Sequence, residues 1–137
     1  MSFMNFNKTT AYAILILSFM GKDQTQISSV DDVFSGTQIP YRYLRKLMTN
    51  LVKSKLIESI QGKFGGYKIA LNVTQISIFD IVAAVEPEYL DSKCFFGLNN
   101  CAFGPACVMH DQWQTVREST IALFKKTYLP ELISKEV

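Results

Sequence analysis

Apolar residues near the start of the chain follow the spacing of helices. Residues 11–20 are almost entirely apolar, which predicts a helix that is buried on most of its sides. Ser29 and Asp32 form a capping box, which predicts the start of a short helix over residues 30–34. Gly36 is placed to close that helix.

The strongest periodicity in the chain follows Pro40, a residue suited to the first turn of a helix. Apolar residues recur there every three or four positions and form one stripe: Leu44, Leu47, Met48, Leu51 and Val52. The residues off this stripe should face solvent: Tyr41, Arg42, Arg45, Lys46 and Asn50. We therefore expect one side of this helix to pack on the core while the other is free to meet a partner.

Two short stretches beyond this helix have the pattern of strands. Residues 56–59 and 67–70 flank the glycine-rich sequence 61–66, which predicts a β-hairpin. Ser77 can then cap another helix, which ends before Pro87. Helices followed by a hairpin in this order predict a winged helix-turn-helix.

The last third of the chain has a different character. Residues 91–105 are rich in Gly, Asn and aromatic residues and show no periodicity, which predicts a loop. A final helix is predicted over residues 110–126, with an apolar arc wider than one core contact needs: Trp113, Val116, Ile121, Leu123 and Phe124. We expect a second copy of the chain to cover the surplus, which makes the protein a homodimer.

Composition limits the class of protein. The chain has 137 residues, 48% of them hydrophobic, which suffices for one core. We find neither a secretion signal nor an apolar segment long enough for a bilayer, so we expect a cytoplasmic protein with no membrane partner. Three cysteines are an odd number, and reduced thiols in a cytosol favour metal or redox chemistry.

Basic residues gather on the predicted helix and hairpin. Seven Lys and Arg lie between Pro40 and Lys68, against one acid, Glu58. A basic helix face alone is usually only solvated, but next to a glycine-rich wing it predicts binding to double-stranded DNA. Arg42 and Arg45 are candidate base readers, since arginine can donate two hydrogen bonds to guanine. The other candidate DNA contacts are Tyr41, Lys46, Lys53, Gln61, Lys63, Phe64 and Gly65, with Lys46, Lys53 and Lys63 placed to neutralise phosphates.

The predicted fold is mostly α with a small β-hairpin wing, a winged helix-turn-helix, plus a long C-terminal dimerisation helix. We expect a DNA-binding domain over residues 1–86 and a cysteine-bearing loop over residues 87–109. The dimerisation helix and a C-terminal tail would follow over residues 110–137.

The three cysteines and the only histidine of the chain lie within one short segment. Cys94, Cys101, Cys107 and His110 follow the pattern C-x6-C-x5-C-x2-H. Structural zinc sites usually pair cysteines two to four residues apart, so zinc is the second choice. An iron-sulfur cluster can take three thiolates and an imidazole, and [2Fe-2S] fits best, with [4Fe-4S] as the alternative. Cysteines that pack as small apolar residues, or that sense oxidation as thiols, remain open alternatives.

Several short segments, in order along the chain, follow the pattern of one family: Tyr12-Ala13, Tyr43-Leu44 with Leu47, Gly62 with residues 65–67, Asp80-Ile81-Val82 and Ala84-Val85-Glu86. Over essentially its whole length the chain resembles the Rrf2 family of winged-helix regulators, and its cysteines and histidine resemble those of the IscR-like iron-sulfur branch. The resemblance implies a homodimer on a near-palindromic DNA site. It also implies that a cluster on Cys94, Cys101, Cys107 and His110 changes DNA affinity.

The chain departs from the family pattern in ways that bear on function. The interval from Cys94 to the next cysteine is one residue longer than is usual in the IscR-like branch. Phe64 replaces a common wing glycine and Gln61 replaces a basic residue that often reaches the minor groove, so the operator should differ. In the nitric-oxide-sensing branch an acidic side chain early in the first helix completes the cluster. The matching position here is Ala11, which favours His110 as the fourth ligand.

The sequence thus predicts a DNA-binding repressor or dual regulator that senses iron-sulfur status, redox state or nitric oxide. An enzyme is not expected, because one histidine without a triad or phosphate loop makes no catalytic constellation. One alternative is the same fold responding through thiol oxidation, zinc or a small ligand. A second is a dimeric scaffold that binds protein.

Overall fold

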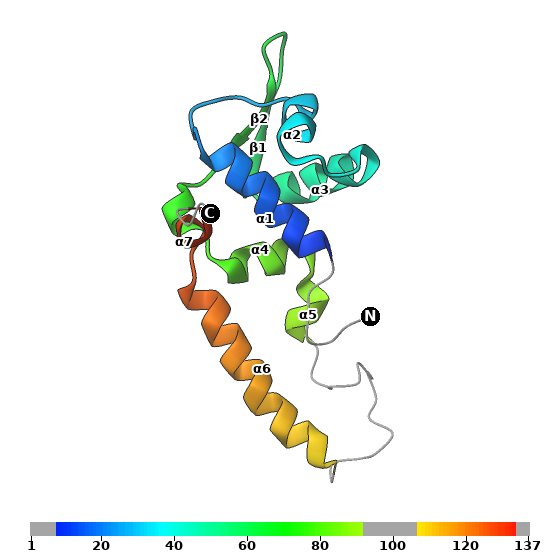
Figure 1. Cartoon of the computed structure of the whole chain (residues 1–137), viewed down its shortest axis with the longest axis vertical. Helices are drawn as coiled ribbons and strands as arrows, with labels where there is room; N and C mark the ends of the chain where they lie inside the picture. Colours follow the sequence, from blue (N-terminus) through cyan, green and yellow to red (C-terminus); the bar gives the residue numbers. More distant parts are fainter. Residues whose placement is uncertain (1–7, 92–106, 134–137) are drawn as a thin grey trace.

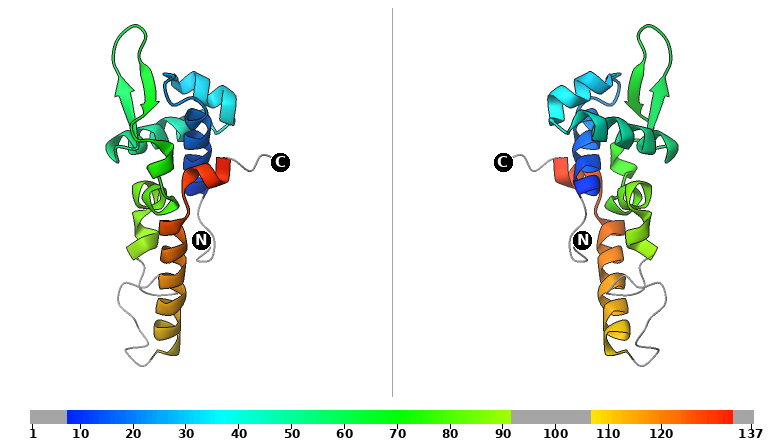
Figure 2. Two further views of the ribbon diagram at one scale, coloured as in Figure 1. Left: turned by 90° about the vertical axis from the view of Figure 1, so that its left-hand side faces the viewer. Right: turned by 90° about the vertical axis from the view of Figure 1, so that its right-hand side faces the viewer.

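The computed structural model describes residues 8–91 and 107–133, and within them it confirms a mostly helical chain with a two-stranded antiparallel hairpin (Figure 1). The first elements form a winged-helix unit: α1 (Lys8–Gly21), α2 (Val30–Thr37), α3 (Tyr41–Lys53), β1 (Ile57–Ile60), β2 (Gly66–Ile69), the 3-10 helix η1 (Val73–Gln75) and α4 (Ile78–Val85). Three helices follow: α5 (Pro87–Asp91), the long α6 (Val108–Lys126) and α7 (Leu129–Ile133). Figure 2 shows the hairpin at one end of the molecule and α6 at the other.

The capping box predicted for α2 is present, but the predicted end of the helix is wrong. The Ser29 hydroxyl accepts from the Asp32 N–H, and the Asp32 carboxylate accepts from the Ser29 N–H, both at 3.0 Å. The helix continues through Gly36 to Thr37, whose hydroxyl donates to the Val33 carbonyl at 2.7 Å. Gln38 then ends it with a φ of 60°, and its N–H donates to the Phe34 carbonyl.

The apolar stripe of α3 packs on the core as predicted, with four residues buried and Val52 partly buried: Leu44, Leu47, Met48 and Leu51. From α1, the core receives Ala13, Ile16, Leu17 and Met20. The buried Leu129 of α7 joins the same core, and its N–H donates to the Ile76 carbonyl at 2.8 Å. The C-terminal end of the described chain is thereby attached to the winged-helix unit, a contact that the sequence did not predict.

The hairpin is present, and each of its strands lies one residue nearer the turn than predicted. Ile57 pairs with Ile69, and Ile60 pairs with Gly66. Ser28, which precedes α2, exchanges two backbone hydrogen bonds of 2.8 Å with Tyr67. This bridge ties the base of the wing to the segment that leads into α2.

The region predicted as a loop over residues 87–109 is not irregular throughout. Helix α5 occupies its start, and α6 begins at Val108, two residues before the predicted His110. Residues 92–106, which include Cys94 and Cys101, lie outside the described part of the chain. Helix α6 packs against α4 and, at about 1.5 Å per residue, its 19 residues span roughly 28 Å. Within the described ranges, none of the helices has the length and apolar character needed to cross a membrane.

The capping box of α4 gives a test of the fold. The Ser77 hydroxyl accepts from the Asp80 N–H at 3.1 Å, and the Asp80 carboxylate accepts from the Ser77 N–H at 3.0 Å. We expect Ser77→Ala to lower the free energy of unfolding by about 1 kcal/mol, measured by chemical denaturation, because an N-terminal donor loses its partner. Ser35→Ala, at an exposed position inside α2, is the control and should leave stability nearly unchanged. Equal unfolding midpoints for the two variants would contradict the role of the cap.

Candidate functional site

The candidate base-reading residues lie on the exposed side of α3. Arg42, Arg45 and Lys46 are all exposed, while the opposite side of the helix is buried in the core. Pro40 is the residue before the helix, and its carbonyl accepts from the Leu44 N–H at 2.9 Å. The first turn of α3 is therefore accessible and could enter a groove of DNA.

Aromatic contacts hold that first turn against its neighbours. The ring of Tyr43 meets Tyr12 of α1 edge to face at 5.4 Å, and its hydroxyl bonds to the Thr9 hydroxyl. The ring of Tyr41 meets Phe34 of α2 in the same manner at 5.8 Å. Both contacts orient α3 before any ligand arrives, which lowers the entropy lost on binding.

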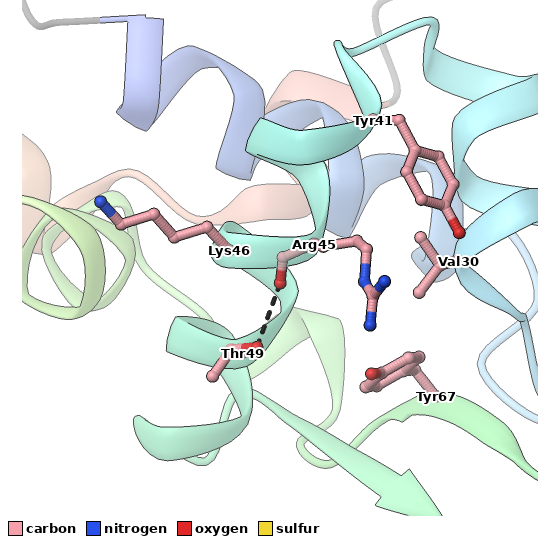
Figure 3. Close-up of a pocket in the computed structure, with 6 residues that line it drawn as sticks. All are labelled: Val30, Tyr41, Arg45, Lys46, Thr49 and Tyr67. Atoms are coloured by element: carbon pink, nitrogen blue, oxygen red, sulfur yellow. Dashed lines mark hydrogen bonds between the residues drawn. The ribbon is translucent and has the colours of Figure 1, made fainter.

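A hollow of about 390 Å³ lies beside α3, between the helix, the start of α2 and the base of the wing. Its walls are formed by Val30, Tyr41, Arg45, Lys46, Thr49 and Tyr67. Figure 3 shows the Arg45 side chain extending between Tyr41 and Tyr67, whereas Lys46 points to the other side of the helix. The Thr49 hydroxyl donates to the Arg45 carbonyl at 3.1 Å. The guanidinium and hydroxyl groups of this hollow suit the phosphate and base oxygens of a nucleic acid.

Thr49 and Tyr67 were not predicted as site residues. Thr49 lies four positions after Arg45, so its place on the exposed face could have been inferred from helical spacing. Tyr67 reaches the hollow from β2, and only the packing of the wing against α3 brings it there. Lys53 is exposed in the last turn of α3, away from the hollow.

The tip of the wing is a tight turn between β1 and β2. The Gly65 N–H donates to the Gly62 carbonyl at 3.1 Å, which places Lys63 and Phe64 at the two central positions of the turn. Gly62 has a φ of +107°, and a Cβ on Gly65 would lie 2.0 Å from the Ile60 carbonyl oxygen. The turn therefore depends on its glycines, and substitution of either would displace the tip.

The wing residues predicted to meet DNA all lie at this tip. Gln61, Lys63 and Phe64 are exposed, and Gly65 is partly exposed. The Gln61 side-chain amide donates to the Ser59 hydroxyl at 3.3 Å. In Figure 1 the hairpin extends past α2 and α3, so its tip can reach a surface that α3 also contacts.

Two of the four candidate cluster ligands are described, and they lie one helical turn apart. Cys107 is the residue before α6, and His110 is the third residue of that helix. The His110 N–H donates to the Cys107 carbonyl at 3.1 Å. Cys107 is a free, partly exposed thiol, and His110 is exposed. Among the described residues no group of three or more metal-binding side chains gathers, and Cys94 and Cys101 are outside them.

Helix α5 is attached to α6 close to the point where the undescribed segment begins. The Arg117 guanidinium donates to the Leu90 carbonyl, and the rings of Tyr89 and Phe124 are 6.3 Å apart. Burial raises the pKa of the Tyr89 hydroxyl, and the charge of Glu86 raises it further. The two helices that flank residues 92–106 therefore contact each other directly.

The five candidate dimerisation residues divide between two sides of α6. Trp113 and Phe124 are each only 8% exposed within a single chain, and Ile121 is partly buried. Val116 and Leu123 are 46% and 51% exposed. Of the five predicted residues, only Val116 and Leu123 therefore form an exposed apolar strip on α6.

Comparison with known proteins identifies the family. A model of the Rrf2 family, described as iron-dependent transcriptional regulators, matches residues 6–135. The chain belongs to the Rrf2 family. One Rrf2 relative, the HTH-type transcriptional regulator NsrR of Oceanobacillus iheyensis, is 30% identical over 97% of this chain and 92% of its own. Another, the HTH-type transcriptional regulator IscR of Klebsiella pneumoniae, is 27% identical over 77% of this chain and 64% of its own.

Solved structures agree with the winged-helix fold of this Rrf2 protein. CymR, the global cysteine regulator of B. subtilis, superposes with a TM-score of 0.77 at 19% identity, covering 97% of this chain and 98% of its own. T. potens IscR gives a TM-score of 0.75 at 18% identity, covering 95% and 86%. The predicted family and fold are confirmed. The protein is a DNA-binding transcriptional regulator rather than an enzyme.

Proposed function

We propose that this Rrf2 protein is a homodimeric regulator that binds near-palindromic double-stranded DNA and senses iron-sulfur status, redox state or nitric oxide. An iron-sulfur cluster on Cys94, Cys101, Cys107 and His110 would set its affinity for DNA. The observation that carries the proposal is the position of Cys107 and His110, one turn apart at the start of α6. The same helix bears the exposed strip at Val116 and Leu123, so ligands and dimer surface share one rigid element.

The described ligands fit an iron-sulfur cluster in their chemistry. Thiolate sulfur binds iron in all such clusters, and imidazole nitrogen replaces some thiolates in [2Fe-2S] centres. The free Cys107 thiol and the exposed His110 ring are both accessible at the end of the helix. The N-terminus of a helix also favours the negative charge that thiolate ligands bring. A bound cluster would supply a link that oxidation or nitric oxide can break.

Residues of this chain can pass a change at the ligands on to the DNA-binding unit. Arg117 holds α5 on α6 through the Leu90 carbonyl, so both ends of the segment 92–106 are anchored to one structure. At the other end of α6, Phe124 packs in the core of the winged-helix unit. A shift of α6 would therefore move the wings of the two protomers relative to each other and change which DNA spacing fits.

The experiment that tests this proposal is anaerobic purification followed by iron and sulfide analysis and visible absorption. We expect the wild type to be coloured and to hold iron and sulfide in equal amounts. Cys101→Ala and Cys107→Ala should each lose both, whereas Thr115→Ala, an exposed control on α6, should keep them. His110→Ala should shift the absorption spectrum, since an imidazole ligand is exchanged or lost. A colourless wild type with neither iron nor sulfide would refute the cluster.

The second candidate is the same DNA-binding fold responding through thiol oxidation. The free, partly exposed Cys107 is the observation that favours it. In that case the wild type holds no iron, and mild peroxide changes its DNA affinity while Cys107→Ala does not respond. The same preparations therefore separate the two candidates.

A further inference from the structure

Phe64 at the tip of the wing has no role in the packing of its own chain. It is 84% exposed, the highest value among the large apolar side chains of the described residues. A single exposed apolar residue is common on protein surfaces, so the position of the ring and the groups around it have to indicate whether it meets a partner. Because packing within the chain does not account for Phe64, we consider a role in binding.

The turn holds the backbone that carries Phe64 in a fixed place. The Gly65 N–H closes the turn on the Gly62 carbonyl, and the crowding at Gly65 leaves no room for a side chain there. Four strand pairs and the Ser28–Tyr67 bridge hold the base of the same hairpin. The apex of the wing is therefore already placed before DNA binds, which reduces the backbone entropy lost on binding.

The charge around the ring indicates what the partner is. The Lys63 ammonium lies over the Phe64 ring, 5.6 Å from its centroid, and the neighbours Gln61 and Gly62 are uncharged. Among the described residues, the acid nearest to Phe64 in sequence is Glu58. It lies on β1, opposite Lys68 in the strand register, and not at the tip. An aromatic ring beside a lysine, on the hairpin that flanks the exposed side of α3, suits a polyanion with apolar surface inside a narrow groove.

We propose that Phe64 is an apolar wedge that inserts into the minor groove of double-stranded DNA and partly unstacks one base step. Proteins that insert apolar side chains there kink the duplex, and the cost is smallest at flexible pyrimidine–purine steps. Phe64 would therefore make the protein prefer such a step at the wing position without any hydrogen bond to a base. The inference rests on the proposed docking of α3 and the wing on one duplex.

The test begins with a duplex selected from a random library by the full-length protein. 2-Aminopurine placed at successive positions of that duplex reports unstacking by a rise in fluorescence. We expect the rise at one step in each half-site with the wild type and Phe64→Leu, which keeps an apolar wedge, and no rise with Phe64→Ala. The affinity of Phe64→Ala should fall about tenfold at a TA step and little at a stiff A-tract.

Leu71→Ala is the matched control, because Leu71 is a large apolar residue that is 43% exposed but lies outside the wing tip. It should behave as the wild type. Equal fluorescence and equal step preference for the wild type and Phe64→Ala would overturn the wedge, and the docking would stand if Arg45→Ala still relaxed base preference. Failure to select any duplex would overturn both. Loss of binding to anionic lipid vesicles in Phe64→Ala, with DNA binding unchanged, would also overturn the wedge.

Discussion

Replacing Arg42 and Arg45 together with alanine is expected to weaken binding to a selected operator roughly a thousandfold. Each bidentate contact between arginine and guanine contributes about 1–3 kcal/mol of discrimination. Two contacts in each of two half-sites therefore total at least about 4 kcal/mol, and each 1.4 kcal/mol corresponds to a factor of ten. Both side chains are exposed, so the free energy of unfolding should change little.

The measurement is titration of labelled duplexes at several salt concentrations, with the operator beside a duplex that is scrambled only at the positions facing α3. The double variant should bind both duplexes with similar low affinity, and Arg45→Ala alone should relax base preference. Lys63→Ala is the control for charge: it should weaken binding to both duplexes alike and lower the salt slope by about one for each protomer, which is about two for the dimer. A double variant that still separates operator from scrambled DNA would show that other residues read the bases.

Local sequence signals placed the starts of α2 and α4, where a capping box is visible, but not the end of α2. The capping boxes at Ser29 and Ser77 were visible because each donor–acceptor pair lies three residues apart. The end of α2 was not, because Gly36 stays helical and the left-handed residue that ends the helix is Gln38 rather than a glycine. Helix α7 is five residues long, and its place depends on a backbone contact with Ile76 far back in the sequence.

The candidate site shows the same division between local and tertiary information. Helical spacing was enough to place Arg42 and Arg45 on the exposed side of α3, because its apolar stripe is continuous. It could not place Tyr67 beside Arg45, since that contact follows from how the wing packs. An apolar residue such as Phe124 likewise looks the same in sequence whether its own core or a second chain covers it.

The location of Phe124 bears on how the protein can respond to a signal. Phe124 fixes one end of α6 in the core, and the candidate ligands Cys107 and His110 lie at the other. In the proposed function, a change at the ligands would be transmitted along this helix to the winged-helix unit. For such a change to alter the arrangement of two protomers, α6 has to contact the second copy. The strip at Val116 and Leu123 lies between its two ends, which is where a second α6 would cross.

Introducing charge into that strip should therefore produce a monomer. Val116 and Leu123 are seven residues apart, two helical turns, so they share one side of α6. In Val116→Asp/Leu123→Asp, burial against a second copy would remove carboxylates from water and bring like charges together, which opposes association. Sedimentation equilibrium should show a monomer. Affinity for the full operator should fall roughly a hundredfold or more, because one protomer can use only one half-site's contacts.

The matched control moves the same two charges one position back along the helix. Thr115 and Ala122 are exposed, are also seven residues apart, and lie about 100° around α6 from the strip. Thr115→Asp/Ala122→Asp should therefore remain a dimer with nearly unchanged operator affinity. If both double variants were dimers, the subunit contact would lie on another surface and α6 could not act between the two protomers. If only the strip variant is monomeric and still binds an isolated half-site weakly, each winged-helix unit reads DNA by itself and α6 sets the spacing between the two.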